Sequence, residues 1–421
     1  MGSTEDGGDD PFSPDSGVLS SAPRSRLTDC FADLTDPRIP RSRRHDLLAI
    51  VTIAVCAVIS GAETWVEVER WGRVKQAWLR TWLEVPNGIP SHDTFGRVFA
   101  RIDPDQFEAG FLRWVHALAQ TAEPEGIAID GKTIRRSGDA RRSRRPLHLV
   151  SAWTSAQHLV LAQEAVSAKA SEVTVLPDLL SRLDLAGQIV TIDAMGCQKT
   201  IAAQIVTGGG DYVLALKANQ PDLLEDVIDS FAVTTTPDGA NRTVEKGHGR
   251  MEWRTCETIV DPAVIAWLDP DGAWSGLRTI ARVTATRQVT GHVPTMMVRY
   301  YVSSLDGDAR QIAHAVRSHW GIENMLHWVL DMGFHEDESR VRIGHSAQNL
   351  AVLRKVALML IQHDPTRTLG VKASRMHAAW DTAYLLALLG AHQDAIALPR
   401  TPQLKGRVVA PWYSESTRGS G

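Results

Sequence analysis

The sequence predicts an α/β protein in which helices flank a mixed β-sheet, with an all-α domain before the sheet and a β-rich insertion within it. Two observations support this prediction. Residues 26–120 show helical spacing of apolar residues, broken by Pro and Gly, whereas short strand-like stretches alternate with helical ones from residue 126 onward. Strand patterns return over residues 242–304, and two long helical patterns follow. Strands interleaved with helices build a sheet with helices on its faces.

The N-terminal part is predicted to be a tail followed by helices. Residues 1–24 are rich in Gly, Ser, Asp and Pro and are expected to be disordered. Ser91 is expected to cap the third helix. Residues 47–62 are almost entirely apolar, but this run is shorter than the ~20 residues that a membrane span needs, and a signal peptide would lie at the N-terminus. We therefore expect a buried core helix there. The four predicted helices cover residues 46–61, 63–83, a stretch from 91 to about 103, and 106–122.

The sheet is predicted from three strands in succession, expected to be antiparallel, followed by helix, strand, helix and strand. The strands are expected at residues 126–134, 147–154, 159–166, 188–193 and 211–217, and the helices at 171–183 and 198–207. The insertion adds strands at 251–260, 277–287 and 295–303, and the final helices cover 308–331 and 346–363. The predicted domains are a tail (1–24), a helical domain (25–122), a core (123–241 and 305–395), the insertion (242–304) and a C-terminal tail (396–421).

Composition narrows the class of protein. Of the 421 residues, 43% are hydrophobic and 22% are charged, which is ordinary for a globular protein and excludes a wholly disordered chain or a rod. The formal charge of −4 lacks the basic excess of a typical nucleic-acid binder. Residues 1–16, however, hold five acids and no base, so the remainder carries +1. The charge distribution is therefore compatible with basic patches that bind nucleic acid.

The cysteines indicate no disulfide framework and no zinc ribbon. Cys30, Cys56, Cys197 and Cys256 form no CxxC pair and no Cys/His zinc spacing. This usage fits a reducing, cytoplasmic compartment. Cys197 is interpreted as a small core residue rather than a thiol nucleophile.

Three acids stand out by their placement: Asp130 within the first strand, Asp193 at the end of the fourth, and Glu323 within a long helix. Each has an ordinary structural alternative, namely a hairpin turn at Asp130, a helix cap at Asp193 and a solvated helix position at Glu323. Together, two acids on adjacent strands and a third from a packed helix would repel one another unless cations lay between them. Mg²⁺ and Mn²⁺ prefer such oxygen ligands and support phosphodiester chemistry.

The motifs around these acids resemble those of DDE transposases of bacterial insertion sequences, in the H-repeat-associated group. The resemblance covers roughly residues 28–365, including the helical block before residue 126. The matching motifs are IDGK at 129–132, TIDAMGCQ at 191–198, GDYV at 210–213, KANQ at 217–220, HGRME at 248–252, RSHWGIEN at 317–324, HW at 327–328, ED at 336–337 and SR at 339–340.

The resemblance implies a ribonuclease-H-like core in which Asp130, Asp193 and Glu323 hold two Mg²⁺ or Mn²⁺ ions. It implies cleavage of double-stranded DNA at the element's terminal inverted repeats by activated water, and then attack of the freed 3′-hydroxyl on target DNA. Elsewhere in the superfamily, a tyrosine–arginine–glutamate–lysine signature surrounds the third acid. Here His319 stands in place of the arginine and Leu330 in place of the lysine. The resemblance therefore implies the metal-binding role for the three acids, but no role for the residues that flank them.

Polar and basic residues near the acids are candidate DNA ligands. The run Arg141–Arg145 is either a solvated loop or a DNA contact, and the helical block is a candidate binder of the terminal repeats. Trp320 and Trp328 are interpreted as core residues, and residues 336–338 as a charged surface beside a helix. The candidates are Lys132, Arg135, Arg136, Lys217, Asn219, Gln220, His248, Arg250, Arg317, His319, Asn324 and His327.

The favoured function is an active transposase, in which pairing of two element ends implies a dimer or a larger assembly. Two alternatives stay open. One is a catalytically inactive DNA-binding protein descended from a transposase. The other is a ribonuclease-H-like nuclease or resolvase.

Overall fold

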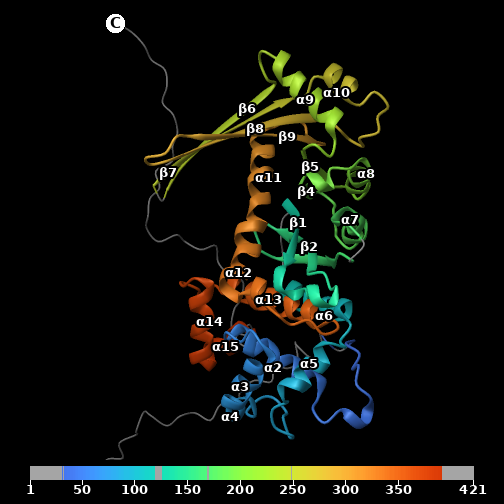
Figure 1. Ribbon diagram of the computed structural model, residues 1–421. Helices are drawn as coiled ribbons and strands as arrows, with labels where there is room; N and C mark the ends of the chain where they lie inside the picture. Colours follow the sequence, from blue (N-terminus) through green and yellow to red (C-terminus); the bar gives the residue numbers. More distant parts are fainter. Residues whose placement is uncertain (1–30, 32, 119–125, 168–169, 248, 391–421) are drawn as a thin grey trace, which may run out of the picture.

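The computed structural model describes residue 31 and residues 33–118, 126–167, 170–247 and 249–390. The two predicted tails and His248 lie outside the described residues. All that follows concerns the described part of the chain (Figure 1).

Nine strands of the described chain form one sheet, in the order β3-β2-β1-β4-β5-β9-β8-β7-β6. β1 pairs antiparallel with β2 and parallel with β4, β2 pairs antiparallel with β3, and β4 pairs parallel with β5. The predicted mixed, ribonuclease-H-like sheet is therefore confirmed. The strands are β1 Gly126–Ile134, β2 Leu147–Thr154, β3 Val160–Ala165, β4 Ile189–Ile192, β5 Asp211–Leu216, β6 Gly239–Gly247, β7 Arg250–Ile259, β8 Thr279–Val289 and β9 Thr295–Ser303.

Helices surround this sheet and extend below it in the view of Figure 1. α7 and α8 lie beside β4 and β5, and α11 crosses the sheet from its distal strands toward the N-terminal helices. The helices are α2 Leu47–Ile59, α3 Trp65–Val74, α4 Gln76–Leu79, α5 His92–Phe99, α6 Pro104–Leu118, α7 Glu172–Ser181, α8 Lys199–Thr207, α9 Pro221–Val233, α10 Pro262–Leu268, α11 Ala309–Gly321, α12 Trp328–Phe334, α13 Ser346–Gln362, α14 Val371–Trp380 and α15 Thr382–Leu388.

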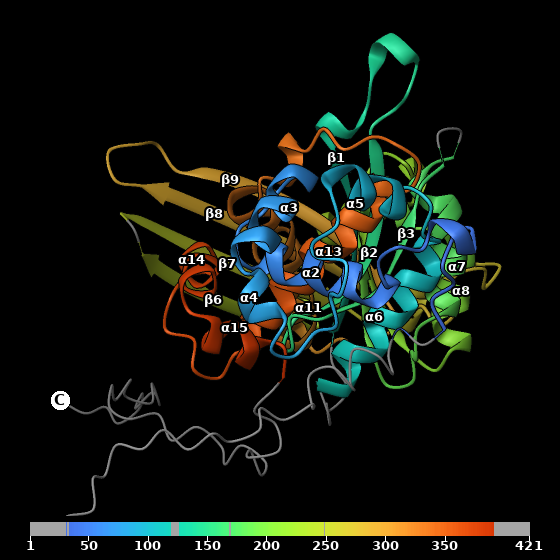
Figure 2. The same ribbon diagram turned by 90° about the horizontal axis from the view of Figure 1, so that it is seen from below.

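The inserted strands continue the central sheet. β9 pairs antiparallel with β5, and β8, β7 and β6 follow outward, so that β6–β9 project as an arm from the end of the sheet (Figures 1 and 2). The arm differs from an insertion with its own separate sheet because backbone hydrogen bonds between Val213–Leu216 and residues 300–303 join it to β5. Its first strand begins at Gly239, slightly before the predicted boundary at residue 242.

The predicted helix over residues 308–331 is three segments in line. α11 ends at Gly321, the π-helical segment Ile322–His327 follows, and α12 begins at Trp328. A π-helical turn widens the helix by one residue and commonly occurs at functional sites. Glu323 lies in this widened segment.

The N-terminal helices share one hydrophobic core with the C-terminal ones. In α2 every residue except Leu48 is buried, and Asp46 caps the helix by accepting a hydrogen bond from the Ala49 amide at 2.9 Å. α2 packs against α13, which is itself buried along nearly its whole length. The predicted core helix at residues 47–62 is thus confirmed. Because the core extends across both parts, the predicted boundary near residue 122 does not separate two independent cores.

One local expectation differs from the structure. The helix expected over residues 63–83 breaks at Lys75, where the chain turns so that Trp71 and Trp82 both pack edge-on against Trp78. Ser91 caps α5 as expected, by accepting from the Thr94 amide. Among the described helices, none is long and apolar enough to span a membrane.

Candidate active site

Asp130 lies in the middle of β1, the strand that separates the antiparallel half of the core from the parallel half. It pairs with Ser151 of β2, and β1 continues to Ile134, which excludes the hairpin-turn alternative. On the other side, Ile129 pairs with Ile192 of β4. Asp193 directly follows Ile192, so the parallel register brings the two aspartates to the same end of neighbouring strands.

Asp193 is also a helix cap, as its structural alternative predicted. One of its carboxylate oxygens accepts a hydrogen bond from the Met195 amide at 3.0 Å, at the start of the short 3₁₀ turn Ala194–Gly196. Two amides from the chain after β5 hold this loop. Asn219 Nδ2 donates to the Ala194 carbonyl at 2.6 Å, and Gln220 Nε2 donates to the Cys197 carbonyl at 3.0 Å. Because both amides are engaged internally, their role here is to fix the loop that carries Asp193.

Glu323 completes the group from the π-helical segment. Its side chain is exposed, while its neighbour Ile322 is fully buried and anchors the segment. α11 packs against β1 and β4, and the π-helical segment itself contacts β1. The third acid therefore comes to the sheet surface above the two strand acids.

The three carboxylates affect one another electrostatically. Burial raises the pKa of Asp193 above its ordinary value, and the charge of Asp130 adds to that rise. Burial likewise raises the pKa of Glu323, again with a contribution from Asp130. Burial also disfavours the charged form of Asp130, but the hydrogen bond and charge of His327 outweigh it and keep the pKa of Asp130 below the usual value.

Two histidines lie beneath this group. His327 is buried, and its Nδ1 lies 3.4 Å from a carboxylate oxygen of Asp130. His319 Nδ1 lies 3.0 Å from the hydroxyl of Thr191 on β4, and burial lowers the pKa of His319. Both rings face inward, toward Asp130 and toward the strand that leads to Asp193, and their assignment as DNA ligands stays a prediction.

Comparisons with known proteins identify the family of the chain. A family model described as "Transposase DDE domain" matches residues 121–360, and one described as "DDE_Tnp_1-associated" matches residues 28–115. "Putative transposase YncI" of Escherichia coli O157:H7 is 38% identical over 86% of this chain and 94% of its own length. "H repeat-associated putative transposase YhhI" of Escherichia coli K12 is 36% identical over 86% of this chain and 97% of its own.

The chain belongs to the DDE transposase family. The family predicted from the sequence motifs is thus confirmed. Among solved structures, a piggyBac transposase synaptic complex with hairpin DNA is similar over 91% of this chain and 83% of its own, with 9% identity and a TM-score of 0.43.

In this transposase, Lys132 points into the protein. Its ammonium group lies 2.7 Å from Asp331 and 3.3 Å from both Glu336 and Asp337, and only 11% of its side chain is exposed. These ion pairs hold Lys132 within the protein, and its contact with DNA stays a prediction. The prediction that residues 336–338 form a solvated surface is wrong for Glu336, which is 1% exposed because it pairs with this lysine.

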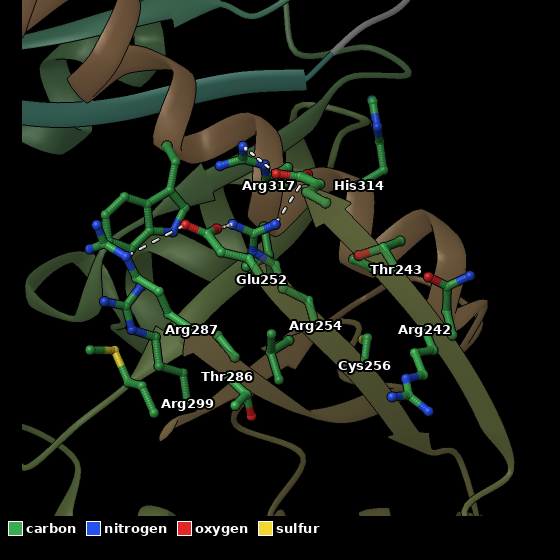
Figure 3. A pocket seen from close by; sticks show the side chains of 18 of the residues that line it. Arg242, Thr243, Glu252, Arg254, Cys256, Thr286, Arg287, Arg299, His314 and Arg317 are labelled. Carbon is green, nitrogen blue, oxygen red and sulfur yellow. Dashed lines mark hydrogen bonds and ion pairs between the residues drawn. The ribbon is translucent and has the colours of Figure 1, made fainter. Parts of the chain in front are cut away.

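The other candidate DNA ligands lie at the surface, although some have protein partners. Arg135 is 82% exposed and pairs with Asp337 at 3.0 Å. Arg136 and Lys217 are exposed, and the charge of Lys217 lowers the pKa of Asp193 slightly against the effect of burial. Three further candidates, Arg250, Arg317 and Asn324, line a groove between the arm and α11, which Figure 3 shows. His248 lies outside the described residues.

The sequence alone did not reveal a fourth carboxylate beside the acids. Glu172 begins α7, its carboxylate lies 2.7 Å from Nε2 of His148, and its charge contributes to the raised pKa of Asp193. A Cβ on Gly131 would stand 2.5 Å from Glu172 and 2.7 Å from His148, so any other residue there would have to displace the ends of these two side chains. The only sequence signal was the position of Glu172 in the first turn of a predicted helix.

Two smaller sequence interpretations have clear outcomes. Cys197 is fully buried, and burial raises the pKa of its thiol to about 12, so it is the core residue that was expected. Trp328 is 59% exposed, which contradicts the expectation of a core residue. Trp320 is half-buried, with the Arg299 guanidinium 4.5 Å from the centre of its ring.

The donor chemistry at Asp130, Asp193 and Glu323 fits a hard divalent cation. Within the described residues, no group of three or more histidine, cysteine, aspartate or glutamate side chains is placed to hold a metal ion. Mg²⁺ is commonly bound by one or two carboxylates, with water and substrate phosphates filling the remaining positions. The three acids match such an open site, which substrate completes, better than a closed structural site.

Proposed function

We propose that this transposase cuts DNA strands at the ends of a mobile element and joins the freed ends to target DNA, with Asp130, Asp193 and Glu323 as the ligands of two divalent metal ions. The observation that carries the proposal is the convergence of the three acids. They come from β1, the end of β4 and the π-helical segment, and the charge of Asp130 raises the pKa of both other acids. Mutually repelling carboxylates at one sheet end favour cations between them.

The bound ions would activate the attacking oxygen and stabilise the leaving oxygen of the phosphodiester. The protein's own part is to hold and orient the groups. His327 fixes the carboxylate of Asp130, and Asn219 and Gln220 fix the loop that carries Asp193. Lys217 is exposed near Asp193, where its charge favours an incoming phosphate. Phosphoryl transfer depends mainly on such positioning and on neutralisation of charge.

The same site would serve both steps, because cleavage and joining are both in-line displacements at phosphorus. Water is the nucleophile in the first step, and the 3′-hydroxyl that it releases is the nucleophile in the second. Two element ends must be joined to one target, so the working assembly is proposed to contain at least two copies of the chain on double-stranded DNA.

The test is strand cleavage by the purified full chain on duplexes that carry the inverted repeats flanking its gene, with Mg²⁺, Mn²⁺ or EDTA. We expect Asp130→Asn, Asp193→Asn and Glu323→Gln each to lower the cleavage rate by about 10²–10³-fold or more, because each removes charge that the transition state needs. Glu338→Gln is the matched control, since Glu338 is an exposed acid close in sequence. Cleavage that survives Asp130→Asn would overturn the site assignment.

The same assay separates the two alternatives. Tight binding of the repeats without cleavage under any metal would support the inactive, DNA-binding alternative. Cleavage of RNA–DNA hybrids or branched DNA in preference to the repeats would support the nuclease or resolvase alternative.

A further inference from the structure

A groove between the arm and α11 reaches the π-helical segment that carries Glu323, because Asn324 lines it. It has a volume of about 960 Å³ and is formed by the inner face of β6–β9 and one side of α11 (Figure 3). We call it the arm groove. Its arginines are Arg242, Arg250, Arg254, Arg287, Arg299, Arg310 and Arg317.

Strand register explains why the lining arginines of β7, β8 and β9 share one surface, whereas Arg242 of β6, which pairs with Thr255, lies on the opposite face. Successive side chains of a strand point to opposite faces, and residues paired across strands point to the same face. Arg287 of β8 pairs with Glu252 of β7, and Arg299 of β9 pairs with Val283 of β8. α11 adds Arg310 and Arg317, which are exposed one above the other at helical spacing. Figure 3 shows side chains from both elements pointing into the same space.

The arm groove carries a large excess of positive charge. Six of its seven lining arginines face the groove, against only two acids, Glu245 and Glu252. Several arginines share these two acids: Arg250 lies 3.2 Å from Glu252, and Arg317 lies 3.3 Å from Glu245. Within the described residues, Arg310 has no ion-pair partner. A confined surface with this balance attracts a polyanion.

The inner end of the groove leads to the acids. Trp320 and Asn324 line that end, and the Asn324 side-chain amide donates to the Trp320 carbonyl at 3.0 Å. Glu323 is the residue directly before Asn324. The half-buried Trp320 ring, with Arg299 over one face, offers an aromatic surface of the kind on which nucleic-acid bases stack.

We propose that the arm groove binds a single DNA strand that leads into or out of the acidic site, with arginines holding its phosphates and Trp320 contacting a base. The inference rests on the proposed function because it identifies the substrate at the acids as DNA. The aromatic surface favours one strand over a duplex, because the bases of a duplex are already stacked and paired, whereas those of a single strand are free to stack on the Trp320 ring.

The test is fluorescence-anisotropy binding of a labelled poly-dT oligonucleotide and of a duplex of equal length, in EDTA and over a range of salt concentrations. For Arg287→Ala/Arg310→Ala we expect a Kd for the single strand at least about 10-fold weaker, with a duplex Kd changed less than about 3-fold. The salt slope of single-strand binding should fall by about 1.4, because each lost phosphate contact removes ~0.7.

Arg278→Ala is the matched control, because Arg278 is 63% exposed, pairs with Asp306 and lies outside the groove. Trp320→Ala should weaken single-strand binding by about 5- to 100-fold, and Trp320→Phe should restore most of it, since base stacking contributes ~1–3 kcal/mol. Unchanged single-strand binding in the double variant would overturn the inference, and so would an equal loss for strand and duplex.

Binding in EDTA needs no catalysis, so the two proposals fail separately. If wild type cleaves DNA but the arginine variants bind the single strand normally, only the groove inference fails. If the variants lose single-strand binding but wild type never cleaves, the groove inference stands and the proposed chemistry fails.

Discussion

Two halves of one sheet use positive charge in different ways. In the catalytic half, Lys132 follows Asp130 by two residues, yet it is 11% exposed and contacts three carboxylates of the same chain. In the arm, arginines outnumber acids on one open face, and Arg287 on that face is 54% exposed. The comparison teaches that nearness in sequence to a catalytic acid does not identify a DNA ligand. A buried ion pair stabilises the fold, whereas an exposed face with excess positive charge can bind a polyanion.

The largest expected effect on stability concerns the buried ion pairs of Lys132. Lys132→Met should lower the free energy of unfolding by about 3–5 kcal/mol, because it leaves buried Glu336 and its neighbours Asp331 and Asp337 without their shared cation. Urea denaturation at neutral pH measures the change.

Arg135→Met is the matched control, since Arg135 contacts the same Asp337 from a position that is 82% exposed. An exposed pair contributes only about 0–1 kcal/mol, so this variant should be nearly as stable as wild type. Equal losses of unfolding free energy from both substitutions would show that the buried ion pairs of Lys132 stabilise the fold no more than a surface ion pair does.

A smaller effect concerns pH. Burial raises the pKa of Glu108 from 4.5 to about 7, while Arg182 and Lys355 oppose the shift. The folded chain therefore binds an extra proton between these values, and stability falls as the pH rises from 4.5 to about 7. Glu108→Gln should remove that fall, because the amide oxygen can still accept the Gln163 amide, which donates to Glu108 at 2.8 Å in the native chain.

Unfolding free energies of wild type and Glu108→Gln at pH 5 and pH 8 check this prediction. The variant should gain stability relative to wild type on going from pH 5 to pH 8. Asp105→Asn, at an exposed position of the same helix, is the control and should show no such gain. A variant that follows the wild-type pH dependence would assign the titration to another group.

The smallest expected effect on stability concerns the exposed arginines of the arm. Arg287→Ala should change the free energy of unfolding by less than about 0.5 kcal/mol, because Arg287 is 54% exposed and lies 3.9 Å from Glu252. Single-strand affinity should nevertheless fall. A loss of stability comparable to that of Lys132→Met would remove the distinction between the two halves.

Local patterns predicted much of the fold. β1 and β2 begin and end where the alternation of apolar residues placed them, and the buried helix at residues 47–59 followed from its unbroken apolar run. The pairing of β5 with β9 joins residues about ninety positions apart, and no local pattern encodes that register. The sheet therefore gained an arm where the sequence predicted only a β-rich insertion.

The candidate site shows the same limit. The three acids were found because each lies at a distinctive point of a strand or helix. The orientation of His319 toward Thr191 and the contact between Lys132 and Asp331 depend on packing between segments more than a hundred residues apart. Sequence spacing indicated which residues lie near the acids but not which of them face solvent.

The shared core of α2 and α13 has a consequence for how the chain is made. α2 is apolar on nearly every side and is covered largely by α13, which is synthesised almost 300 residues later. During translation, the N-terminal helices therefore emerge with an apolar surface that nothing yet covers, and they complete their packing only when most of the chain has left the ribosome. Such long-range closure slows folding and leaves the nascent chain open to aggregation in the meantime.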